Sequence, residues 1–223
     1  MKKIAELYSS LNTEIIYTDP VSSQLIKYLS NAYLPLRLSF VNEASRIIDE
    51  LNANQEDVLK GVGLDSRIGL DYFRPSPGWG GSCFPKDVQE IQELARNQNL
   101  NLPLVQSIIN SNDVHISWFT DKLVDLLESN NLEKVCLIGA SFKENTDDIR
   151  HSPTFIIYQK LQLRGVKVEI YDNYVSTDFV LNDFDLLKDN SLIVEMFPLG
   201  DTYNKLEDKI QELQNTFYYR FWN

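Results

Sequence analysis

The chain has 223 residues, of which 43% are hydrophobic and 24% are charged, a composition that predicts one or two globular domains. Its formal net charge of −11 is spread along the sequence without a basic tract, which argues against general affinity for nucleic acid or anionic membrane. Two cysteines cannot build a disulfide framework, and no apolar run reaches the ~20 residues of a membrane span. With no secretory signal at the start, these features predict a cytoplasmic protein.

The first half of the chain is expected to be helical. Residues 1–11 predict a short helix, followed by a strand-like stretch at 14–19. An apolar period predicts a long helix over 22–52, introduced by Pro20 and kinked near Asn31 by Pro35. Residues 65–83 predict a loop, and further helices are expected at 54–63, at 85–98 and, as one or two helices, at 102–130.

The second half has the alternating pattern of a small α/β domain. A buried strand at 133–141, a helix at 152–165 and a strand at 166–172 predict a βαβ unit with parallel strands. Later segments predict a strand at 191–197, a helix at 204–214 and a short last strand at 216–221. In such a doubly wound sheet, ligands bind at the carboxyl ends of the strands, here at the loop 140–153. No GxGxxG follows any strand, so this domain is not predicted to bind a dinucleotide by itself.

The segment GWGGSCFPKDV, residues 78–88, carries the first candidate site. Its glycines suit a tight turn or close approach to a ligand, and Cys83 stands just before a helix with Lys86 in its first turn. A thiol in such surroundings is typical of a reactive cysteine. The alternative is a surface turn with an incidental cysteine.

Two further groups of residues are candidates. Lys27 and Asn31 are four residues apart, so they share one face of the long helix, although an exposed lysine and an asparagine that merely weakens the helix would have the same spacing. The loop 140–153 places Lys143 and Arg150 between a strand end and a helix start, which suits an anion, although a solvated charged loop is the simpler reading. His115 and His151 are too few and too far apart to predict a metal site.

Taken together, the segments LIKYLSNAYLPLRLSFVNE, DSRIGLDYFRPSPGWGGSCFPKDV and GASFKENTDDIRHSP resemble the UDP-glucose/GDP-mannose dehydrogenase family, in the family's order. The resemblance extends over nearly the whole chain and favours the UDP-glucose branch. It implies an α/β protein with a central all-helical dimerisation domain, followed by a small doubly wound parallel-sheet domain that binds the nucleotide sugar. The expected division is 1–20 as a remnant leading into the central domain, 21–131 and 132–223. The family's amino-terminal NAD-binding domain has no counterpart in this sequence.

The resemblance also implies roles for individual residues in an NAD-dependent oxidation of UDP-glucose to UDP-glucuronate. It assigns catalysis to Cys83, Lys27, Asn31 and Asp87, with Cys83 as the nucleophile. It assigns cofactor contacts to Lys86 and Arg150. Substrate contacts are implied for Tyr72, Phe73, Arg74, Pro75, Ser76, Gly80, Lys143, Arg67 and Arg220, with Arg67 reaching the sugar from the partner subunit of a homodimer built across the long helix.

Three alternatives stay open on the sequence. The chain could be an inactive nucleotide-sugar-binding or dimerising fragment, or part of a GDP-mannose or other UDP-sugar dehydrogenase. A redox-sensing thiol protein would need a resolving cysteine near Cys83, whereas Cys136 lies on an expected buried strand.

Overall fold

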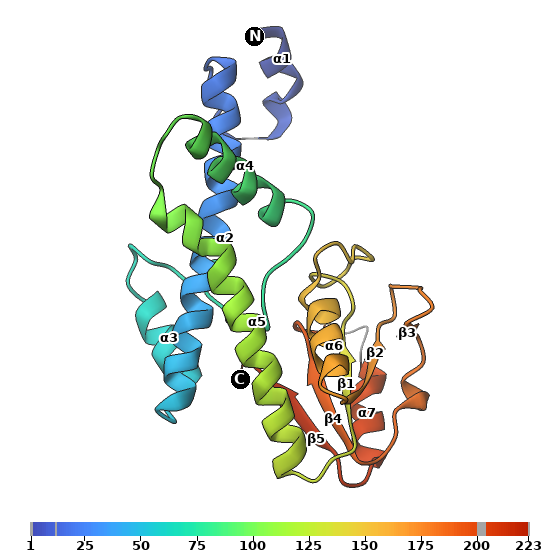
Figure 1. Ribbon diagram of the computed structural model, residues 1–223. Helices are drawn as coiled ribbons and strands as arrows, with labels where there is room; N and C mark the ends of the chain where they lie inside the picture. The colour runs from blue at the N-terminus through green and yellow to red at the C-terminus, as the bar shows by residue number, and fades with distance from the viewer. Residues whose placement is uncertain (1, 12, 200–203, 223) are drawn as a thin grey trace.

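The computed structural model describes residues 2–11, 13–199 and 204–222. Its first part is helical (Figure 1). The elements in chain order are α1 (Lys2–Leu7), the 3₁₀ turn η1 (Ser9–Leu11), α2 (Pro20–Glu50), α3 (Gln55–Gly63), α4 (Phe84–Asn97) and α5 (Pro103–Ser129).

The long helix α2 begins where its capping residues predict. The Asp19 carboxylate accepts hydrogen bonds from the backbone N–H groups of Val21 and Ser22, both at 3.0 Å, and Pro20 is the first helical residue. The helix continues without interruption through the buried Pro35. The expected strand at 14–19 is wrong, because these residues have no strand partner and are mostly exposed.

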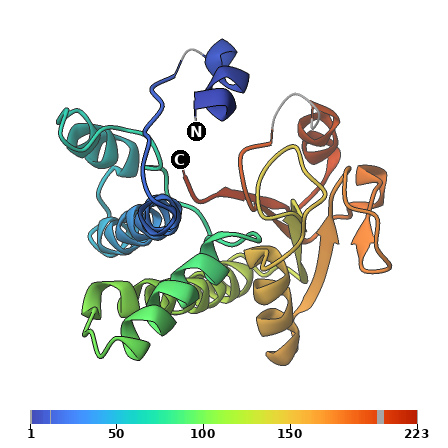
Figure 2. The same ribbon diagram turned by 90° about the horizontal axis from the view of Figure 1, so that it is seen from above.

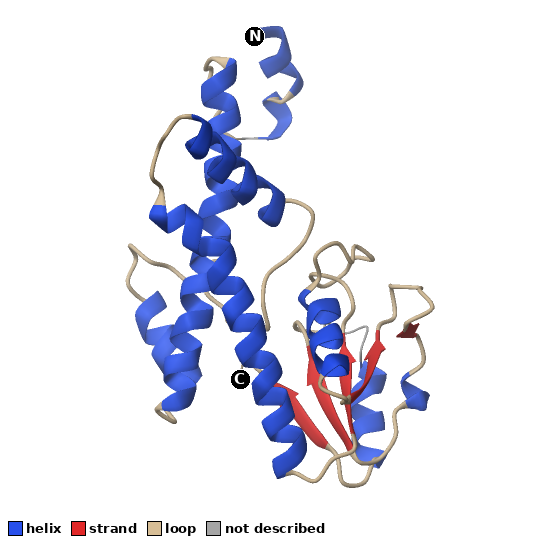
Figure 3. Ribbon diagram, in the orientation of Figure 1, coloured by secondary structure: helices blue, strands red, loops and turns tan. Residues whose placement is uncertain are grey.

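The second part is a five-stranded parallel sheet in the order β3-β2-β1-β4-β5 (Figure 3). The strands are β1 (Lys134–Ile138), β2 (Lys167–Tyr171), β3 (Val180–Leu181), β4 (Ser191–Glu195) and β5 (Phe217–Arg220), each paired in parallel with its neighbour. The remaining elements are α6 (Pro153–Leu163), the 3₁₀ turn η2 (Phe184–Leu186) and α7 (Asn204–Glu212). The α/β class and the doubly wound parallel sheet are therefore confirmed, while the two-residue strand β3 was not foreseen.

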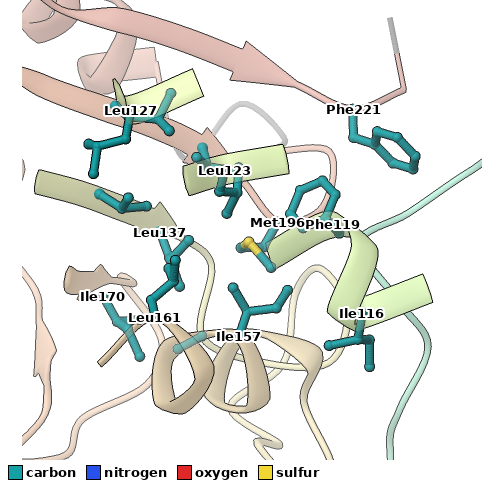
Figure 4. Close-up of a cluster of buried hydrophobic side chains, with 14 of the residues drawn as sticks. Ile116, Phe119, Leu123, Leu127, Leu137, Ile157, Leu161, Ile170, Met196 and Phe221 are labelled. Atoms are coloured by element: carbon teal, nitrogen blue, oxygen red, sulfur yellow. The ribbon is translucent and has the colours of Figure 1, made fainter. Parts of the chain in front are cut away.

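Helix α5 belongs to both parts of the molecule. Seen from above, it extends from beside α2 to the sheet (Figure 2). Its carboxyl-terminal half packs with α6 on one sheet face, through a buried cluster that includes Phe119, Leu123, Leu137 and Ile157 (Figure 4). On the other face, α7 and η2 cover Cys136 and Ile193. The helical part and the sheet therefore share one continuous rigid element.

Candidate functional site

A buried carboxylate on α4 joins the side chains that the sequence singled out on α2. The Asp87 side chain has no solvent exposure, and its Oδ2 accepts from Lys27 Nζ at 3.1 Å and from Asn31 Nδ2 at 2.6 Å. Lys86 Nζ lies 2.9 Å from Asp87 Oδ1. The structure thus brings together Lys27, Asn31, Lys86 and Asp87, which we call the Asp87 cluster.

The charges of the Asp87 cluster fix its protonation state. Burial by itself would raise the pKa of Asp87, but the ion pair with Lys86 and the hydrogen bonds from Asn31 and Lys27 outweigh it and lower the pKa to about 2. The same ion pair raises the pKa of Lys86. At neutral pH the cluster is therefore one carboxylate held between two ammonium groups.

Cys83 lies one helical turn before Asp87. It is the residue preceding α4, its backbone oxygen accepts from Asp87 N–H at 2.8 Å, and its side chain is exposed. Residues four apart share a helix face, so the thiol and the Asp87 cluster lie on the same side of the start of α4. Among the described residues both cysteines are free thiols, and Cys136 is fully buried in β1, where burial raises the pKa of its thiol to about 12.

The glycine loop before Cys83 lies against the loop that follows β1. Gly81 N–H donates to Arg150 O at 3.0 Å, and a Cβ at Gly80 would lie 1.9 Å from His151 O. Gly81 has φ +89°, and a Cβ there would meet the ring of Phe142 at 2.8 Å. Only glycines allow this approach. The loop 139–152 at the carboxyl edge of the sheet is thereby placed beside Cys83.

The cations of that loop are exposed. Arg150 pairs with Asp148, its NH2 group 2.7 Å from Oδ2, and this hydrogen-bonded pair lowers the pKa of Asp148 and raises that of Arg150. Lys143 Nζ lies 5.5 Å from the centre of the Phe142 ring. Both cations thus stand next to the residues that contact the glycine loop.

The predicted substrate loop divides into a scaffold and an exposed part. Phe73 is buried with Val41, so its ring contributes to packing and is not available to a ligand. Pro75 is buried as well. Tyr72 and Arg74 are exposed, and Tyr72 has a φ of +54°, a conformation that a bulky residue rarely adopts.

Two predicted substrate arginines are engaged elsewhere. Arg67 is 87% exposed and pairs with Asp65 at 2.7 Å. Arg220 Nε donates to Glu195 Oε1 at 2.7 Å, and its NH2 group donates to Glu207 at 3.2 Å. The structure does not bring either of them into contact with the Asp87 cluster or with Cys83.

Sequence reasoning missed the buried polar residues that hold the glycine loop. They are Ser39 and Asn42 on α2, Trp79 in the loop, and Asn112 and His115 on α5. The available signal was a polar residue at an apolar position of a helix: Asn112 and His115 share the buried side of α5 with Ile108 and Ile116. Buried polar groups of this kind require partners, which a loop backbone can supply.

In the described part of the sheet domain, the acidic position of a usual dinucleotide site is already engaged. Asp172, at the end of β2, holds the position from which an acidic residue contacts a ribose in such sites. Its carboxylate instead accepts from the backbone N–H groups of Ala140 at 2.7 Å, Tyr174 at 2.7 Å and Val175 at 3.0 Å. The described residues also contain no group of acidic, histidine or cysteine side chains that could hold a metal ion. No helix in the described ranges is long and apolar enough to cross a membrane.

Comparison with known families defines the class of protein. Residues 21–114 match the central domain, and residues 136–198 the UDP binding domain, of one group of nucleotide-sugar dehydrogenases. The two matches follow each other in order and together take up more than half of the chain. The chain belongs to the UDP-glucose/GDP-mannose dehydrogenase family.

Curated relatives include the UDP-glucose 6-dehydrogenases of Rickettsia felis, 36% identical over 173 residues, and of Bacillus subtilis, 36% identical over 169 residues. These alignments cover 77% and 76% of the chain but only 39% and 38% of the relatives. The chain therefore spans about two-fifths of their length.

Solved structures give the same picture. A UDP-glucose dehydrogenase from Pyrobaculum islandicum superposes with a TM-score of 0.76 at 26% identity, over 91% of this chain and 49% of that one. The UDP-N-acetyl-mannosamine dehydrogenase of Staphylococcus aureus also gives 0.76, at 25% identity over 100% and 56%. The fold is thus common to members that act on different nucleotide sugars.

Proposed function

We propose that the chain is the substrate-binding and thiol-bearing part of a UDP-glucose 6-dehydrogenase, which oxidises UDP-glucose to UDP-glucuronate with NAD as the hydride acceptor. The observation that carries the proposal is the Asp87 cluster one helical turn from the exposed thiol of Cys83. Cations, an amide donor and a carboxylate beside a nucleophile are the groups that oxidation through an acyl intermediate requires.

Cys83 would act as the covalent nucleophile. Once the C6 alcohol of the sugar has been oxidised to the aldehyde, the thiolate attacks it and forms a thiohemiacetal. A second loss of hydride converts this adduct to a thioester, and water cleaves the thioester to release the acid and the free thiol. The exposure of Cys83 supports this role, because an incoming sugar can reach the sulfur.

Lys27 and Asn31 would stabilise negative charge on the C6 oxygen. Each donates one hydrogen bond to Asp87, which leaves Lys27 with two further N–H donors and the Asn31 amide with one. Lys27 is also 57% exposed, so it can meet a ligand without breaking its ion pair. Asp87 itself has a pKa of about 2, which makes it a weak base. It would therefore orient the attacking water and the two donors, rather than take up a proton.

The nucleotide sugar would lie between the two parts of the molecule. We propose a division into 1–20, 21–131 and 132–223, with Tyr72, Arg74, Gly80 and Lys143 contacting the substrate. Phe73, Pro75 and Ser76 would contribute by holding the loop in place, and Arg220 would reach the substrate only by leaving Glu195. Lys86 and Arg150 would meet the cofactor at its edge, since the residues described here do not form a complete dinucleotide site.

A homodimer across α2 completes the proposal. Leu29, Phe40 and Ile47 are 55%, 58% and 63% exposed on this helix, although they are large apolar residues. A helix that is apolar beyond its core-facing stripe is typically covered on a second side. In such a dimer the exposed Arg67 would reach the partner subunit's site by leaving its ion pair with Asp65.

Calorimetric titration of the chain with UDP-glucose, UDP-N-acetylmannosamine and GDP-mannose tests the proposal. We expect UDP-glucose to bind most tightly, and Lys27→Met to weaken it by roughly tenfold, the loss of one charge-assisted hydrogen bond. Lys60→Met, which removes an exposed lysine of α3, is the matched control. If none of the three nucleotide sugars binds, the proposal is refuted. If GDP-mannose binds more tightly than UDP-glucose, the assignment of UDP-glucose as the substrate is refuted.

A further inference from the structure

Two side chains of α5 hold the glycine loop by its backbone. Asn112 Oδ1 accepts from Trp79 N–H, and Asn112 Nδ2 donates to Trp79 O, both at 3.0 Å. One turn later, His115 Nε2–H donates to Ser76 O at 2.8 Å. Asn112 is 7% exposed and His115 is fully buried, so water does not compete for these bonds.

The opposite side of the same loop is bound to α2. Asn42 Oδ1 accepts from Ser76 N–H at 2.9 Å, and Trp79 Nε1–H donates to Ser39 Oγ at 2.9 Å. The loop thus has no secondary structure of its own, but side chains of α2 and α5 both hold it. The last residue that they bind, Trp79, is four residues before Cys83.

His115 also connects the loop to the last strand. Its ring lies 5.5 Å from the ring of Phe221, just beyond β5, and is stacked on Trp118 at the same distance. Figure 4 shows Phe221 beside the α5 segment that carries Ile116 and Phe119. The position of the loop is therefore coupled to the packing between α5 and the sheet.

We propose that Asn112 and His115 are positioning residues, which hold the loop 76–81 so that Cys83 faces a nucleotide sugar bound against the loop 139–152. The inference rests on the proposed function, because that function supplies the nucleotide sugar that Cys83 would face. Without the three hydrogen bonds of this pair, the loop would populate other positions. The apparent affinity for the ligand is then the intrinsic affinity multiplied by the fraction of chains whose loop keeps the binding position.

The test measures alkylation of Cys83 by iodoacetamide in the full 223-residue chain, with peptide mass spectrometry and a series of UDP-glucose concentrations. Asn112→Leu removes the amide but keeps the branching and the number of non-hydrogen atoms, and His115→Phe keeps an aromatic ring but removes the donor. For both, we expect the half-protecting concentration of UDP-glucose to rise roughly three- to tenfold, as for the loss of one to two hydrogen bonds. His115→Gln restores an N–H donor and is expected to return to within twofold of the wild type.

Asn110→Leu is the matched control, because Asn110 is exposed on the same helix and should leave protection unchanged. Cys136 is the internal control for folding, since it is labelled only when the sheet opens. Should Asn112→Leu not fold, Asn112→Ala removes the same amide group without adding bulk or charge.

The outcomes separate the two proposals. A protected wild type with unchanged half-protecting concentrations in both variants would overturn the positioning role and leave the proposed function standing. A wild type that no nucleotide sugar protects would refute the proposed function. In that case the positioning role of Asn112 and His115 is tested by the rate at which Cys83 is labelled without ligand. We expect this rate to change at least threefold in both variants. An unchanged rate would overturn the positioning role as well.

Discussion

The substitution Asp87→Asn tests the electrostatics of the Asp87 cluster. It removes the negative charge between Lys27 and Lys86 but keeps a side-chain oxygen that can accept from Asn31. Because the carboxylate is fully buried and both lysines are paired with it, we expect the variant to fold with lower stability.

The magnitude follows from the pKa of Asp87. A fall from the ordinary value of 3.8 to about 2 corresponds to about 2 kcal/mol of native-state stabilisation at neutral pH. The side chains of Lys27 and Lys86 are 57% and 58% exposed, so solvent screens part of the attraction. We therefore expect Asp87→Asn to lower the free energy of unfolding by about 1–2 kcal/mol at pH 7.

The pH dependence has a defined sign. The pKa is lower in the folded chain, so the stabilisation is complete well above 3.8 and is lost as the pH falls through about 2. About half of it remains near pH 3. The stability difference between wild type and Asp87→Asn should therefore narrow between pH 7 and pH 3.

Urea unfolding at several pH values, followed by circular dichroism, measures this difference. Asp113→Asn removes an exposed carboxylate on α5 and is the matched control. A gap that stays constant from pH 7 to pH 3, or an equal loss in Asp113→Asn, would refute the argument that the cluster stabilises an ionised Asp87.

Three other predictions concern the whole chain. Iodoacetamide should label Cys83 at least tenfold faster than Cys136, because Cys136 is buried and its pKa is raised to about 12; equal rates would contradict this. The purified chain should form no NADH with UDP-glucose, since hydride transfer needs an oriented cofactor and Asp172 is already occupied; NADH formation that requires Cys83 would contradict it. Sedimentation should give a dimer that Phe40→Asp converts to a monomer, and a monomeric wild type at tens of micromolar would be the opposite result.

Local signals in the sequence predicted most of the fold. Helices α2, α5 and α6 begin with Pro20, Pro103 and Pro153. Proline suits the first helical position because the backbone N–H that it lacks would have no partner within the helix there. The stretch at 14–19 has strand-like residues but lies away from the sheet, so no neighbour supplies the hydrogen bonds of a strand. Strand β3 has only two residues and is set by its pairing with β2, which no local pattern reveals.

The candidate site was predictable only in part. The helical spacing placed Lys27 and Asn31 on one face, and this is confirmed by their common partner. Their partner, Asp87, was assigned to the site by the family resemblance and by no local pattern, because it lies 56 residues after Asn31 and the packing of α2 on α4 brings it there. The bonds of Asn112 to Trp79 span 33 residues, and neither a local pattern nor the resemblance indicated them.

Gly80 shows how closely the two parts of the molecule are fitted at the site. A Cβ at this position would lie 1.9 Å from His151 O and 2.8 Å from His151 C, and these are backbone atoms that a side-chain rotation cannot move. Gly80→Ala must therefore push the glycine loop away from the loop 139–152 and strain the hydrogen bond from Gly81 N–H to Arg150 O. We expect a loss of roughly 1–3 kcal/mol in unfolding free energy, as for other overpacked sites, and weaker binding of UDP-glucose. Gly61→Ala, in α3 with nothing within 4 Å of the added Cβ, is the control and should instead stabilise the chain by about 1 kcal/mol. If Gly80→Ala unfolds at the same urea concentration as the wild type and binds UDP-glucose equally well, the contact between the two loops does not position Cys83.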